Sequence, residues 1–539
     1  MTIPSTQRAV QLVGPNELQL NDNKDVFKPE AHQVLAKVEV VGLCFSDLKL
    51  LKQYDGHVRK SDILTGVDTS ILNAIPSYAP NAKPTVPGHE TVVRIVEVGD
   101  QVQGINVGDR FLVQTDYRWL KTAQSNAAFG YNFEGALQEY VLMDQRVITD
   151  PDGESMLIPA ANELPASSVA LVEPWACVED SYVVCERQTI KKGGQCLVVA
   201  NDLVSEDTLA TFFETQPQPA NITWLDGDTD NLAEESFDDV LFFGCNADLL
   251  EALFPKVAKN GLVILMQCGQ TFARDVVSPV GRFHYGGVRL AATTTSDPSC
   301  AMGSIPATGE LREGDRVDVV GAGGPMGTMH VIRNVCQGVA GVSVFGGDMS
   351  DERLEMLDKL TQPLAEKNNV SFSTYNAKTS PPEGLFDYLA LMVPAPALVA
   401  DAVKRAAPKG VINIFAGIPA TVYHPLDLNQ FATKQLYFIG TSGSVIEDMK
   451  IVLGKVTART LDTNLSVAAI SGLDGAVEGI RAVENQLMPG KIIVYPSCKG
   501  LGLTPLDKLG EVHPEVAALL EDGTWTKAAE EKLVSLYEA

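Results

Sequence analysis

Three short motifs carry side chains that zinc accepts as ligands. Cys44 follows an apolar, alternating run, His89 and Glu90 stand together after a Pro-Gly pair, and Glu173 lies further along before a proline. A thiolate, an imidazole and one or two carboxylates can hold zinc and leave a position open for water or substrate. Each motif alone is weak, since a lone cysteine is usually a packed thiol and a His-Glu pair is usually part of a solvated turn. Together and in this order they indicate a catalytic metal site.

A glycine-rich turn after residues 317–320 predicts a second kind of site, for a dinucleotide. Glycines let backbone N–H groups approach a pyrophosphate, and the helix N-terminus that follows favours negative charge. The register stays open, because the glycines fit either a fingerprint one residue longer than usual or an Ala-x-Gly-x-x-Gly variant, and a plain tight turn is the alternative. The turn residues expected to contact the cofactor are Gly321, Gly323, Gly324, Pro325, Met326 and Gly327.

Asp348 closes the next short apolar run, residues 342–345, and its carboxylate is placed to hold ribose hydroxyls. An acidic residue here favours NAD over NADP, whose 2′-phosphate would need Arg or Lys. The alternative is that Asp348 only caps the helix that begins near Asp351. We also count Arg353, in the first turn of that helix, among the candidate cofactor-binding residues.

The elements that must position these residues follow two patterns. Residues 9–147 alternate apolar and polar with Gly and Pro turns, which predicts a small β-barrel-like domain. Residues 195–269 and 317–417 each alternate strands with helices, which predicts two tandem doubly wound units. The first unit has no glycine in its turn at 201–207, and acidic charge there would repel a pyrophosphate. We therefore expect a degenerate unit that packs against the second as a scaffold; an inserted domain with its own ligand is the alternative.

The whole-chain totals narrow the class of ligand. A chain of 539 residues is longer than one hydrophobic core usually organises, so several structural units are expected. Its net charge of −26 argues against nucleic acid or an anionic membrane surface as a partner, because both would repel it. The sequence has neither a signal segment nor a long apolar run, and its nine cysteines form no C-x-x-C. We predict a cytoplasmic protein that acts on a small molecule, with a homo-oligomer possible.

In order, the motifs resemble those of the zinc-containing medium-chain dehydrogenases, especially sorbitol and other polyol dehydrogenases. The matching segments are Cys44 to Asp47, Pro87 to Glu90, Val107 to Arg110, Gly135 to Val141, Glu173 to Cys177 and the turn at Gly321. The resemblance implies an α/β protein with a GroES-like β-barrel catalytic domain and Rossmann-type doubly wound units. It also implies that Cys44, His89 and one or both of Glu90 and Glu173 bind one catalytic zinc ion.

Further roles follow from the same resemblance. Ser46 corresponds to the residue that hands the substrate's hydroxyl proton onward, and Asp47 to the carboxylate that orients the histidine ligand. Lys49 stands where the family often has a relay histidine, so His57 is a possible substitute. Many relatives carry a four-cysteine structural zinc lobe, but no cysteine lies between Cys44 and Cys177, so we predict no structural zinc.

We predict a catalytic domain over 1–165, completed by 465–498, a degenerate Rossmann-like unit over 166–310 and an NAD-binding Rossmann domain over 311–464. An acidic, partly helical tail over 499–539 lies outside the resemblance, and its expected role is packing or an oligomer contact. Residues 55–85 form an insertion relative to the family. The insertion could cover the substrate, shape an oligomer contact, or be a loose surface loop.

The predicted function is a zinc-dependent oxidoreductase that interconverts a secondary alcohol of a polyol, sugar, sugar phosphate or cyclitol with its ketone, using NAD. Two alternatives remain: the same fold using bound NAD transiently for elimination or epimerisation of a sugar, and a non-catalytic scaffold. A phosphorylated substrate would need basic groups near the metal, and the nearest candidates are Lys49, Arg59 and Lys60.

Overall fold

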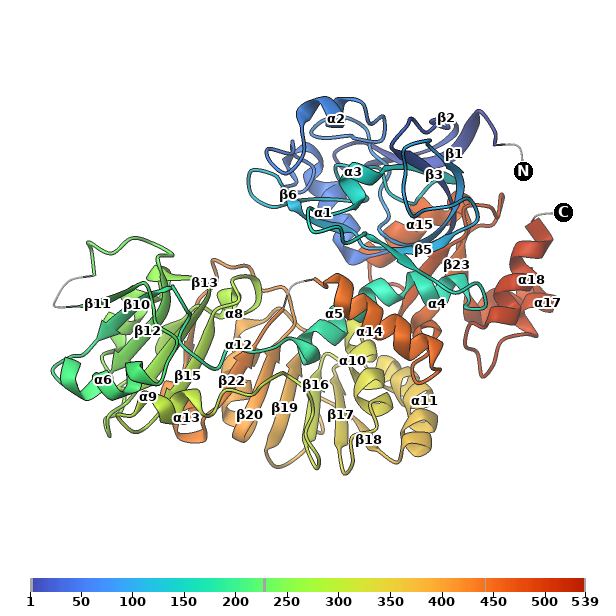
Figure 1. Ribbon diagram of the computed structural model, residues 1–539. Helices are drawn as coiled ribbons and strands as arrows, with labels where there is room; N and C mark the ends of the chain where they lie inside the picture. Colours follow the sequence, from blue (N-terminus) through green and yellow to red (C-terminus); the bar gives the residue numbers. More distant parts are fainter. Residues whose placement is uncertain (1–2, 226–228, 442, 538–539) are drawn as a thin grey trace. The chain divides into compact units, whose positions relative to one another are not determined.

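The computed structural model describes residues 3–225, 229–441 and 443–537 (Figure 1). It divides into two compact units, Met1–Ala176 with Ser444–Ala539, and Cys177–Gly443. The first unit therefore includes both ends of the chain, and the second contains both predicted doubly wound units.

The first unit is built on a mostly antiparallel sheet in which β3 (Gln33–Gly42) is central. Its strand order is β25-β23-β24-β3-β4-β5-β9, and β8 also pairs with β3. The other strands are β4 (Glu90–Val98), β5 (Arg110–Val113), β8 (Tyr140–Asp144), β9 (Leu157–Pro159), β23 (Val467–Ser471), β24 (Lys491–Val494) and β25 (Thr504–Pro505). The apolar residues of β3 are buried along nearly its whole length, as expected for a strand with neighbours on both sides.

Two hairpins and a set of helices complete this unit. The hairpins are β1 (Thr6–Gly14) with β2 (Glu17–Asp25) and β6 (Asp116–Lys121) with β7 (Asn126–Ala128). The helices are α1 (Phe45–Gln53), α2 (Thr69–Asn73), α3 (Gln145–Ile148), α4 (Ala166–Ala170), α14 (Ile446–Thr457), α15 (Leu473–Glu484), α16 (Leu509–Val512), α17 (Pro514–Ala517) and α18 (Lys527–Tyr537).

The C-terminal tail packs into the first unit. Trp525 is fully buried, and its indole N–H donates to the Tyr495 hydroxyl at 2.8 Å. The carboxylate of Glu530 on α18 accepts hydrogen bonds from the backbone N–H groups of Ala166 (2.5 Å) and Ser167 (2.8 Å) at the start of α4. A carboxylate at a helix N-terminus satisfies free N–H groups and favours the helix dipole. The tail therefore fixes the segment that leads towards Glu173.

Helix α14 also belongs to the first unit, although the sequence placed residues up to 464 in the NAD-binding domain. Its buried side chains include Met449, Val452 and Val456, the helix packs on α4, and Lys450 pairs with Glu154 at 2.9 Å. The boundary at Ser444 thus lies before this helix, because its apolar face is buried against the catalytic unit.

The insertion over 55–85 is bound to the barrel rather than loose. The ammonium of Lys60 is fully buried and donates to the carbonyls of Ala79, Asn81 and Lys83 at 2.6–2.7 Å. At the other side of the insertion, Ser77 Oγ donates to the Leu142 carbonyl at 2.9 Å. Because all three of its protons are committed to carbonyls, Lys60 is not a free cation for a substrate.

The second unit contains two parallel sheets, as the alternating pattern predicts. The first has the order β11-β10-β12-β13-β15 and the second β18-β17-β16-β19-β20-β22, the doubly wound order. The first sheet has strands β10 (Gln195–Val199), β11 (Asn221–Trp224), β12 (Phe237–Phe243), β13 (Val257–Met266) and β15 (Arg289–Thr293). The second has β16 (Arg316–Val320), β17 (Ser343–Asp348), β18 (Ser371–Asn376), β19 (Phe386–Leu391), β20 (Ala406–Ile414) and β22 (Tyr437–Ile439).

Helices flank both sheets. They are α5 (Val172–Val183), α6 (Glu206–Glu214), α7 (Ala247–Leu253), α8 (Val280–Tyr285), α9 (Pro298–Met302), α10 (Pro325–Cys336), α11 (Asp351–Asn368), α12 (Pro396–Arg405) and α13 (Leu428–Lys434).

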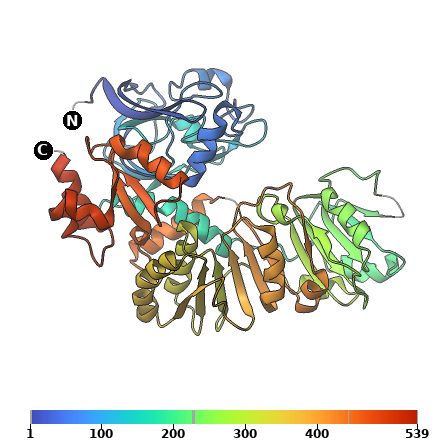
Figure 2. The ribbon, with the colours of Figure 1, turned by 180° about the vertical axis from the view of Figure 1, so that it is seen from behind.

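The two halves of this unit pack through equivalent elements. Strand β14 (Val276–Ser278) of the first half pairs antiparallel with β21 (His424–Leu426) of the second, and the last strands of the two sheets, β15 and β22, contact each other. Helix α8 of the first half packs on β22, and α13 of the second packs on β15. The view from behind shows the sheets side by side (Figure 2). Such reciprocal contacts are those of an isologous interface.

The interface is closed by aromatic rings. Phe438 stacks on Phe283 and on Phe431 with ring centroids 4.7 Å apart in each case, and all three side chains are fully buried. One continuous hydrophobic core runs through both halves. We therefore expect neither half to be stable without the other.

Replacing the central ring of this stack tests that expectation. Phe438→Ala should lower the free energy of unfolding by about 3–5 kcal/mol, because a large buried side chain is lost and a cavity remains. Hydrogen exchange should accelerate in β13 and β15 as well as in β20 and β22. The matched control is Phe212→Ala, in α6 of the first half, which should accelerate exchange only locally. Acceleration confined to residues 311–443 in the Phe438 variant would show that the halves fold independently.

Candidate active site

The pairing of β3 with β4 brings the predicted metal ligands together. Gly42, near the end of β3, is the register partner of Glu90, the first residue of β4. Cys44 and His89 therefore lie just beyond the paired ends of adjacent strands. One donor atom each from Cys44, His89 and Glu90 lies within 4.8 Å of the other two. A soft thiolate, an imidazole and a carboxylate at this separation form a donor set that fits zinc.

Only one of the two carboxylate oxygens of Glu90 has a hydrogen-bond partner among the described residues. Its Oε1 accepts a hydrogen bond of 2.5 Å from Lys491 Nζ on β24, and both side chains are buried. Its Oε2 is buried and has no hydrogen-bond partner among the described residues. A Cβ atom on residue 42 would lie 2.3 Å from this oxygen, so the strand needs glycine there. A buried, unpartnered carboxylate oxygen is what a metal ligand leaves when no ion is present.

Glu173, in the first turn of α5, belongs to the same group of charges. Burial raises the pKa of its carboxyl to about 7, with His89 opposing the rise and Glu90 adding to it. Lys491 interacts with Glu173 as well as with Glu90. The closest donor set contains Glu90, and Glu173 is the second carboxylate beside it.

Helix α1 positions the residues that surround the histidine. Asp47 is fully buried, and its Oδ2 accepts from the backbone N–H of Cys44 at 3.1 Å. Its Oδ1 lies 3.1 Å from His89 Nδ1, which leaves Nε2 directed towards the donor cluster. Burial by itself lowers the pKa of His89, but Asp47 and Tyr131 raise it above its ordinary value. The arrangement is that of a carboxylate that orients a metal-binding histidine.

Ser46 lies directly at the donor cluster. Its Oγ is 3.1 Å from Cys44 Sγ and 3.2 Å from His89 Nε2. The two residues considered for the outer proton relay differ in burial. Lys49 is exposed on α1, whereas His57 is buried with its ring 5.1 Å from that of Tyr131. Burial, followed by repulsion from Arg59 and Lys49, lowers the pKa of His57 to about 4.

Tyr131 and Lys491 are site residues that sequence reasoning missed. The Tyr131 ring lies 5.8 Å from that of His89, and burial raises the pKa of its hydroxyl while the Ser46 side chain acts against that rise. A Cβ atom on Gly135 would lie 2.2 Å from the Gly88 carbonyl, so glycine lets the Tyr131 segment pack beside the residue that precedes His89. The nearby Gly130, with φ +82°, was the available signal. Lys491 had no signal, because its strand lies 401 residues beyond Glu90.

The glycine turn has the geometry of a nucleotide-binding turn. Gly321 takes φ +87°, Gly324 is the N-cap of α10, and Pro325 occupies the first turn of that helix. A Cβ atom on Gly327 would lie 2.2 Å from the Gly321 carbonyl, so glycine is required for the helix to approach the turn. These positions support the register Gly321, Gly323, Gly327, with Met326 between the last two.

Asp348 lies over this turn. Its Oδ2 accepts from the backbone N–H of Gly323 at 3.1 Å, and its Oδ1 accepts from Met349 at 2.7 Å and Ser350 at 3.1 Å. The N-cap of α11 is Ser350, so Asp348 is not itself the cap. Arg353 is half-buried beside Gly323. A Cβ atom added to Gly323 would lie 2.7 Å from the Cβ atom of Arg353.

The equivalent turn in the first half is filled by side chains. Asn201 and Asp202 both take positive φ values, and Asn201 Nδ2 donates to the Phe243 carbonyl at 2.6 Å. Leu203 Cδ1 lies 2.9 Å from where a Cβ on Gly244 would be. Side chains therefore occupy the space that a pyrophosphate needs.

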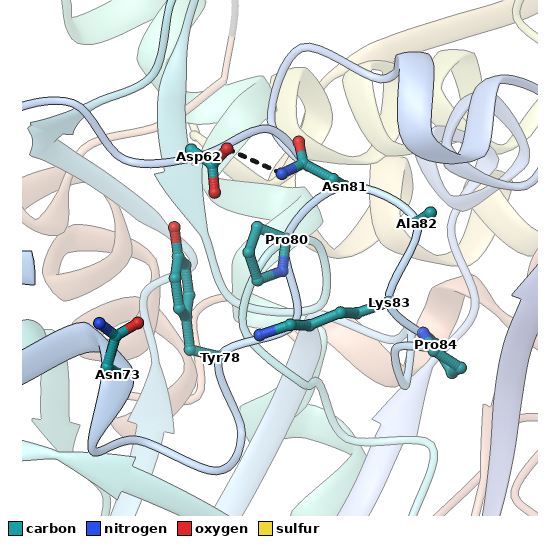
Figure 3. Close-up of a pocket in the computed structure, with 8 residues that line it drawn as sticks. All are labelled: Asp62, Asn73, Tyr78, Pro80, Asn81, Ala82, Lys83 and Pro84. Carbon is teal, nitrogen blue, oxygen red and sulfur yellow. Dashed lines mark hydrogen bonds between the residues drawn. The ribbon is translucent and has the colours of Figure 1, made fainter.

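A surface hollow in the insertion contains none of the predicted site residues. Its lining includes Asp62, Tyr78 and Lys83, and Asn81 Nδ2 donates to Asp62 Oδ2 at 2.8 Å (Figure 3). Among the described residues, every helix is too short or too polar to cross a lipid bilayer.

Residues 30–152 match the family model of the alcohol dehydrogenase GroES-like domain. The chain is 31% identical to L-sorbose 1-phosphate reductase of Klebsiella pneumoniae over 156 residues, 28% of this chain and 36% of that protein. It is 29% identical to sorbitol dehydrogenase of Halalkalibacterium halodurans over 185 residues, 32% and 42% of the two chains. Each match spans less than half of the relative's length. The structure of 2R,3R-butanediol dehydrogenase from Bacillus subtilis aligns with a TM-score of 0.53 at 15% identity, covering 91% of this chain and all of that one.

Fold and site together define a GroES-like domain joined to Rossmann-type sheets, as the sequence predicted. The chain is similar to alcohol dehydrogenases in this GroES-like domain, and over parts of its length to L-sorbose 1-phosphate reductase and sorbitol dehydrogenase.

The buried Glu90–Lys491 pair gives a measurable expectation. In metal-free protein, Lys491→Met should lower the free energy of unfolding by about 3–5 kcal/mol, because it leaves a buried carboxylate without its partner. Lys450→Met is the matched control, since it removes an exposed pair with Glu154 and should cost at most about 1 kcal/mol. Urea unfolding in the presence of a chelator measures both. Equal, small effects would mean that Glu90 does not depend on Lys491.

Proposed function

We propose that the protein is a zinc-dependent oxidoreductase that interconverts a secondary alcohol of a polyol, sugar, sugar phosphate or cyclitol with its ketone, using NAD. The observation that carries this proposal is the convergence of Cys44, His89 and a half-engaged Glu90 within 4.8 Å, with the Ser46 hydroxyl bonded to the first two. A merely structural thiol or histidine would not need a buried carboxylate oxygen without a partner beside it.

The donor set fits zinc, so Cys44, His89 and Glu90 would hold the ion, with Glu173 as the alternative carboxylate. Bound zinc would supply Lewis acidity towards a substrate oxygen, and NAD would accept or return the hydride. A single catalytic ion is proposed, since no cysteine lies between Cys44 and Cys177 to build a second, structural site.

The chain's own residues would orient the ligand and move the proton. Asp47 fixes the ring of His89 through Nδ1, so that Nε2 faces the donor cluster. Ser46 Oγ, 3.1 Å from Cys44 Sγ and 3.2 Å from His89 Nε2, would receive the proton of the substrate hydroxyl and release its own, with Tyr131 as the neighbouring hydroxyl. The His57 ring lies 5.1 Å from that of Tyr131, tilted by 37°, and is the next polar group along this path.

The second half of the Rossmann unit would hold NAD. Gly321, Gly323, Gly324 and Gly327 bring the backbone close to the pyrophosphate, at the N-terminus of α10. Asp348 would hold the ribose hydroxyls, and Arg353 lies beside the same turn. An acidic group there supports NAD over NADP.

The relatives' names support a polyol or sugar-type substrate, because one reduces L-sorbose 1-phosphate and another oxidises sorbitol. The nine cysteines lie far apart in the sequence with no C-x-x-C spacing, which supports the proposed reducing, cytoplasmic location. A homo-oligomer remains a prediction.

Loss of the thiolate tests the metal assignment. Cys44→Ser should abolish bound zinc and reduce turnover of polyols at least about 100-fold, because a metal ligand is replaced by a poor one. NAD affinity should stay unchanged. Cys196→Ser, which alters a buried thiol of the first half, is the control that should retain zinc. Atomic absorption, NADH absorbance and NAD titration give the three readouts, and retained zinc in the Cys44 variant would contradict the site.

The ribose contact is tested at Asp348. Asp348→Asn should weaken NAD binding about 10-fold or more, because a charged hydrogen-bond acceptor is lost, and should reduce the preference for NAD over NADP. Asp351→Asn changes an exposed carboxylate in the next helix and should leave both unchanged. Fluorescence titration with NADH and NADPH measures them. Unaltered affinities in the Asp348 variant would remove the residue from the cofactor site.

A further inference from the structure

We propose that Tyr285, which belongs to the half without a glycine turn, contacts the nicotinamide ring of the NAD bound to the other half. This inference rests on the proposed use of NAD, and it gives the first half a part in the cofactor site beyond its packing role. Tyr285 would bind the cofactor and would not carry the substrate proton.

The strand order of the second half indicates where each end of a dinucleotide would lie. In the order β18-β17-β16-β19-β20-β22, one mononucleotide binds at the carboxyl ends of the first three strands and the other at those of the last three. Asp348 ends β17, so the adenosine half of NAD would lie on that side. The nicotinamide half would therefore lie at the carboxyl ends of β19, β20 and β22.

Helix α8 of the first half reaches two of these strand ends. It packs on β22 (Figure 1), and His284 Nδ1 lies 3.0 Å from the carbonyl oxygen of Ile414, the last residue of β20. A Cβ atom on Gly440, which follows β22, would lie 2.6 Å from the Phe283 carbonyl oxygen. Glycine at 440 therefore lets α8 approach the end of β22.

The same helix holds the loop that follows β20, residues 415–423. The backbone N–H of Gly281 donates to the Val422 carbonyl at 3.1 Å. A Cβ atom on Gly281 would overlap the Pro419 carbonyl oxygen, so glycine is required for the loop to pass this close. The first half thus fixes a loop at the end of the sheet where the nicotinamide would bind.

Tyr285, the last residue of α8, lies against this loop. A Cβ atom on Gly417 would lie 2.6 Å from the Tyr285 hydroxyl oxygen and 3.5 Å from Cζ of its ring. The φ of Gly417 is not positive, so the backbone conformation does not require glycine there. The close approach of the tyrosine hydroxyl does, and it fixes the side chain at the nicotinamide end of the sheet.

The ring of Tyr285 is suited to contact another flat ring. The residue is 40% exposed, whereas its neighbours Phe283 and His284 are buried. The His284 ring lies 4.4 Å from the tyrosine ring and almost perpendicular to it, at 86°, which restrains the plane of the tyrosine. Because the hydroxyl lies against Gly417, the ring provides the exposed surface. Aromatic rings attract each other in offset-stacked or edge-to-face geometry, and nicotinamide is the aromatic part of this half of NAD.

Two ligands that differ at the nicotinamide ring test the proposal. We would titrate the full-length protein with NAD and with ADP-ribose, which lacks that ring, by calorimetry. Tyr285→Ala should weaken NAD binding about 10-fold, because a ring–ring contact is lost, and should change ADP-ribose binding less than about twofold. Tyr285→Phe keeps the ring and should bind NAD within about threefold of wild type. Equal losses for both ligands in Tyr285→Ala, or no loss for NAD, would overturn the assignment.

Gly417 offers a second, compensating variant. Gly417→Ala would place a methyl group 2.6 Å from the Tyr285 hydroxyl oxygen, which should displace the ring and weaken NAD binding but not ADP-ribose binding. In the double variant Gly417→Ala/Tyr285→Phe the nearest ring atom lies 3.5 Å from the methyl group, an ordinary contact. NAD affinity should then return to within about threefold of wild type. A loss that persists in the double variant would contradict the role of Tyr285.

Tyr423→Ala is the matched control, because Tyr423 is a similarly exposed tyrosine (36%) of the same loop. It should change the affinity for neither ligand. The same selective loss of NAD binding in Tyr423→Ala would assign the effect to the loop as a whole and would overturn the role of Tyr285.

These measurements separate the inference from the proposed function, because they report binding without turnover. A selective loss of NAD binding in Tyr285→Ala supports the nicotinamide contact even if no polyol is oxidised, in which case the dehydrogenase proposal alone fails. Normal NAD binding in Tyr285→Ala overturns the contact and leaves the dehydrogenase proposal standing. Wild-type protein that binds neither NAD nor ADP-ribose overturns both.

Discussion

The antiparallel pairing of β3 with β4 is the constraint on which the candidate site depends. With Gly42 opposite Glu90, the two strand ends place Cys44 and His89 next to each other. A slip of one residue would turn every side chain of β4 to the other face of the sheet. The Glu90–Lys491 bond adds a third strand to this arrangement, because β24 pairs with β3 as well. The predicted metal ligands are therefore held at the paired ends of two buried strands, where Glu90 begins β4 and Cys44 and His89 lie just beyond the strand ends.

The same dependence on distant chain segments explains what could be predicted from the sequence. Short local motifs contain Cys44, His89, Glu90 and Gly321, and the residue types in these motifs indicate which ligands they can bind. The structure brings the first three residues together. Lys491 and Tyr131 have no such motif, since each acquires its role only from the strand or turn beside it. Their contacts lie far apart in sequence, and periodicity carries no information about pairs of that kind.

The domain boundaries were also difficult to predict from the sequence, for a related reason. The pattern of α14 is that of any amphipathic helix, and nothing in it states whether its apolar face meets a nucleotide sheet or the catalytic unit. Likewise, the role of the tail depends on a single carboxylate, Glu530, that reaches the start of α4. The role of the insertion was equally open from sequence. The buried ammonium of Lys60 binds three carbonyls of the insertion itself, and Ser77 joins the insertion to the barrel at Leu142.

The first Rossmann-type half has the strand order of a nucleotide-binding fold without a glycine turn. Its turn at Asn201 contains no glycine and is filled by side chains, and its last strand, its α8 helix and its β14 strand contact equivalent elements of the second half. The backbone N–H of Glu186 donates to the Ala307 carbonyl at 2.9 Å, so the two ends of this half lie together, as in an inserted domain. Substitutions in the turn at 201–207 change mostly exposed residues, whereas removal of the whole first half would expose Phe438 and the core around it. Burial of that apolar surface gives a physical reason for keeping the half, independent of any cofactor.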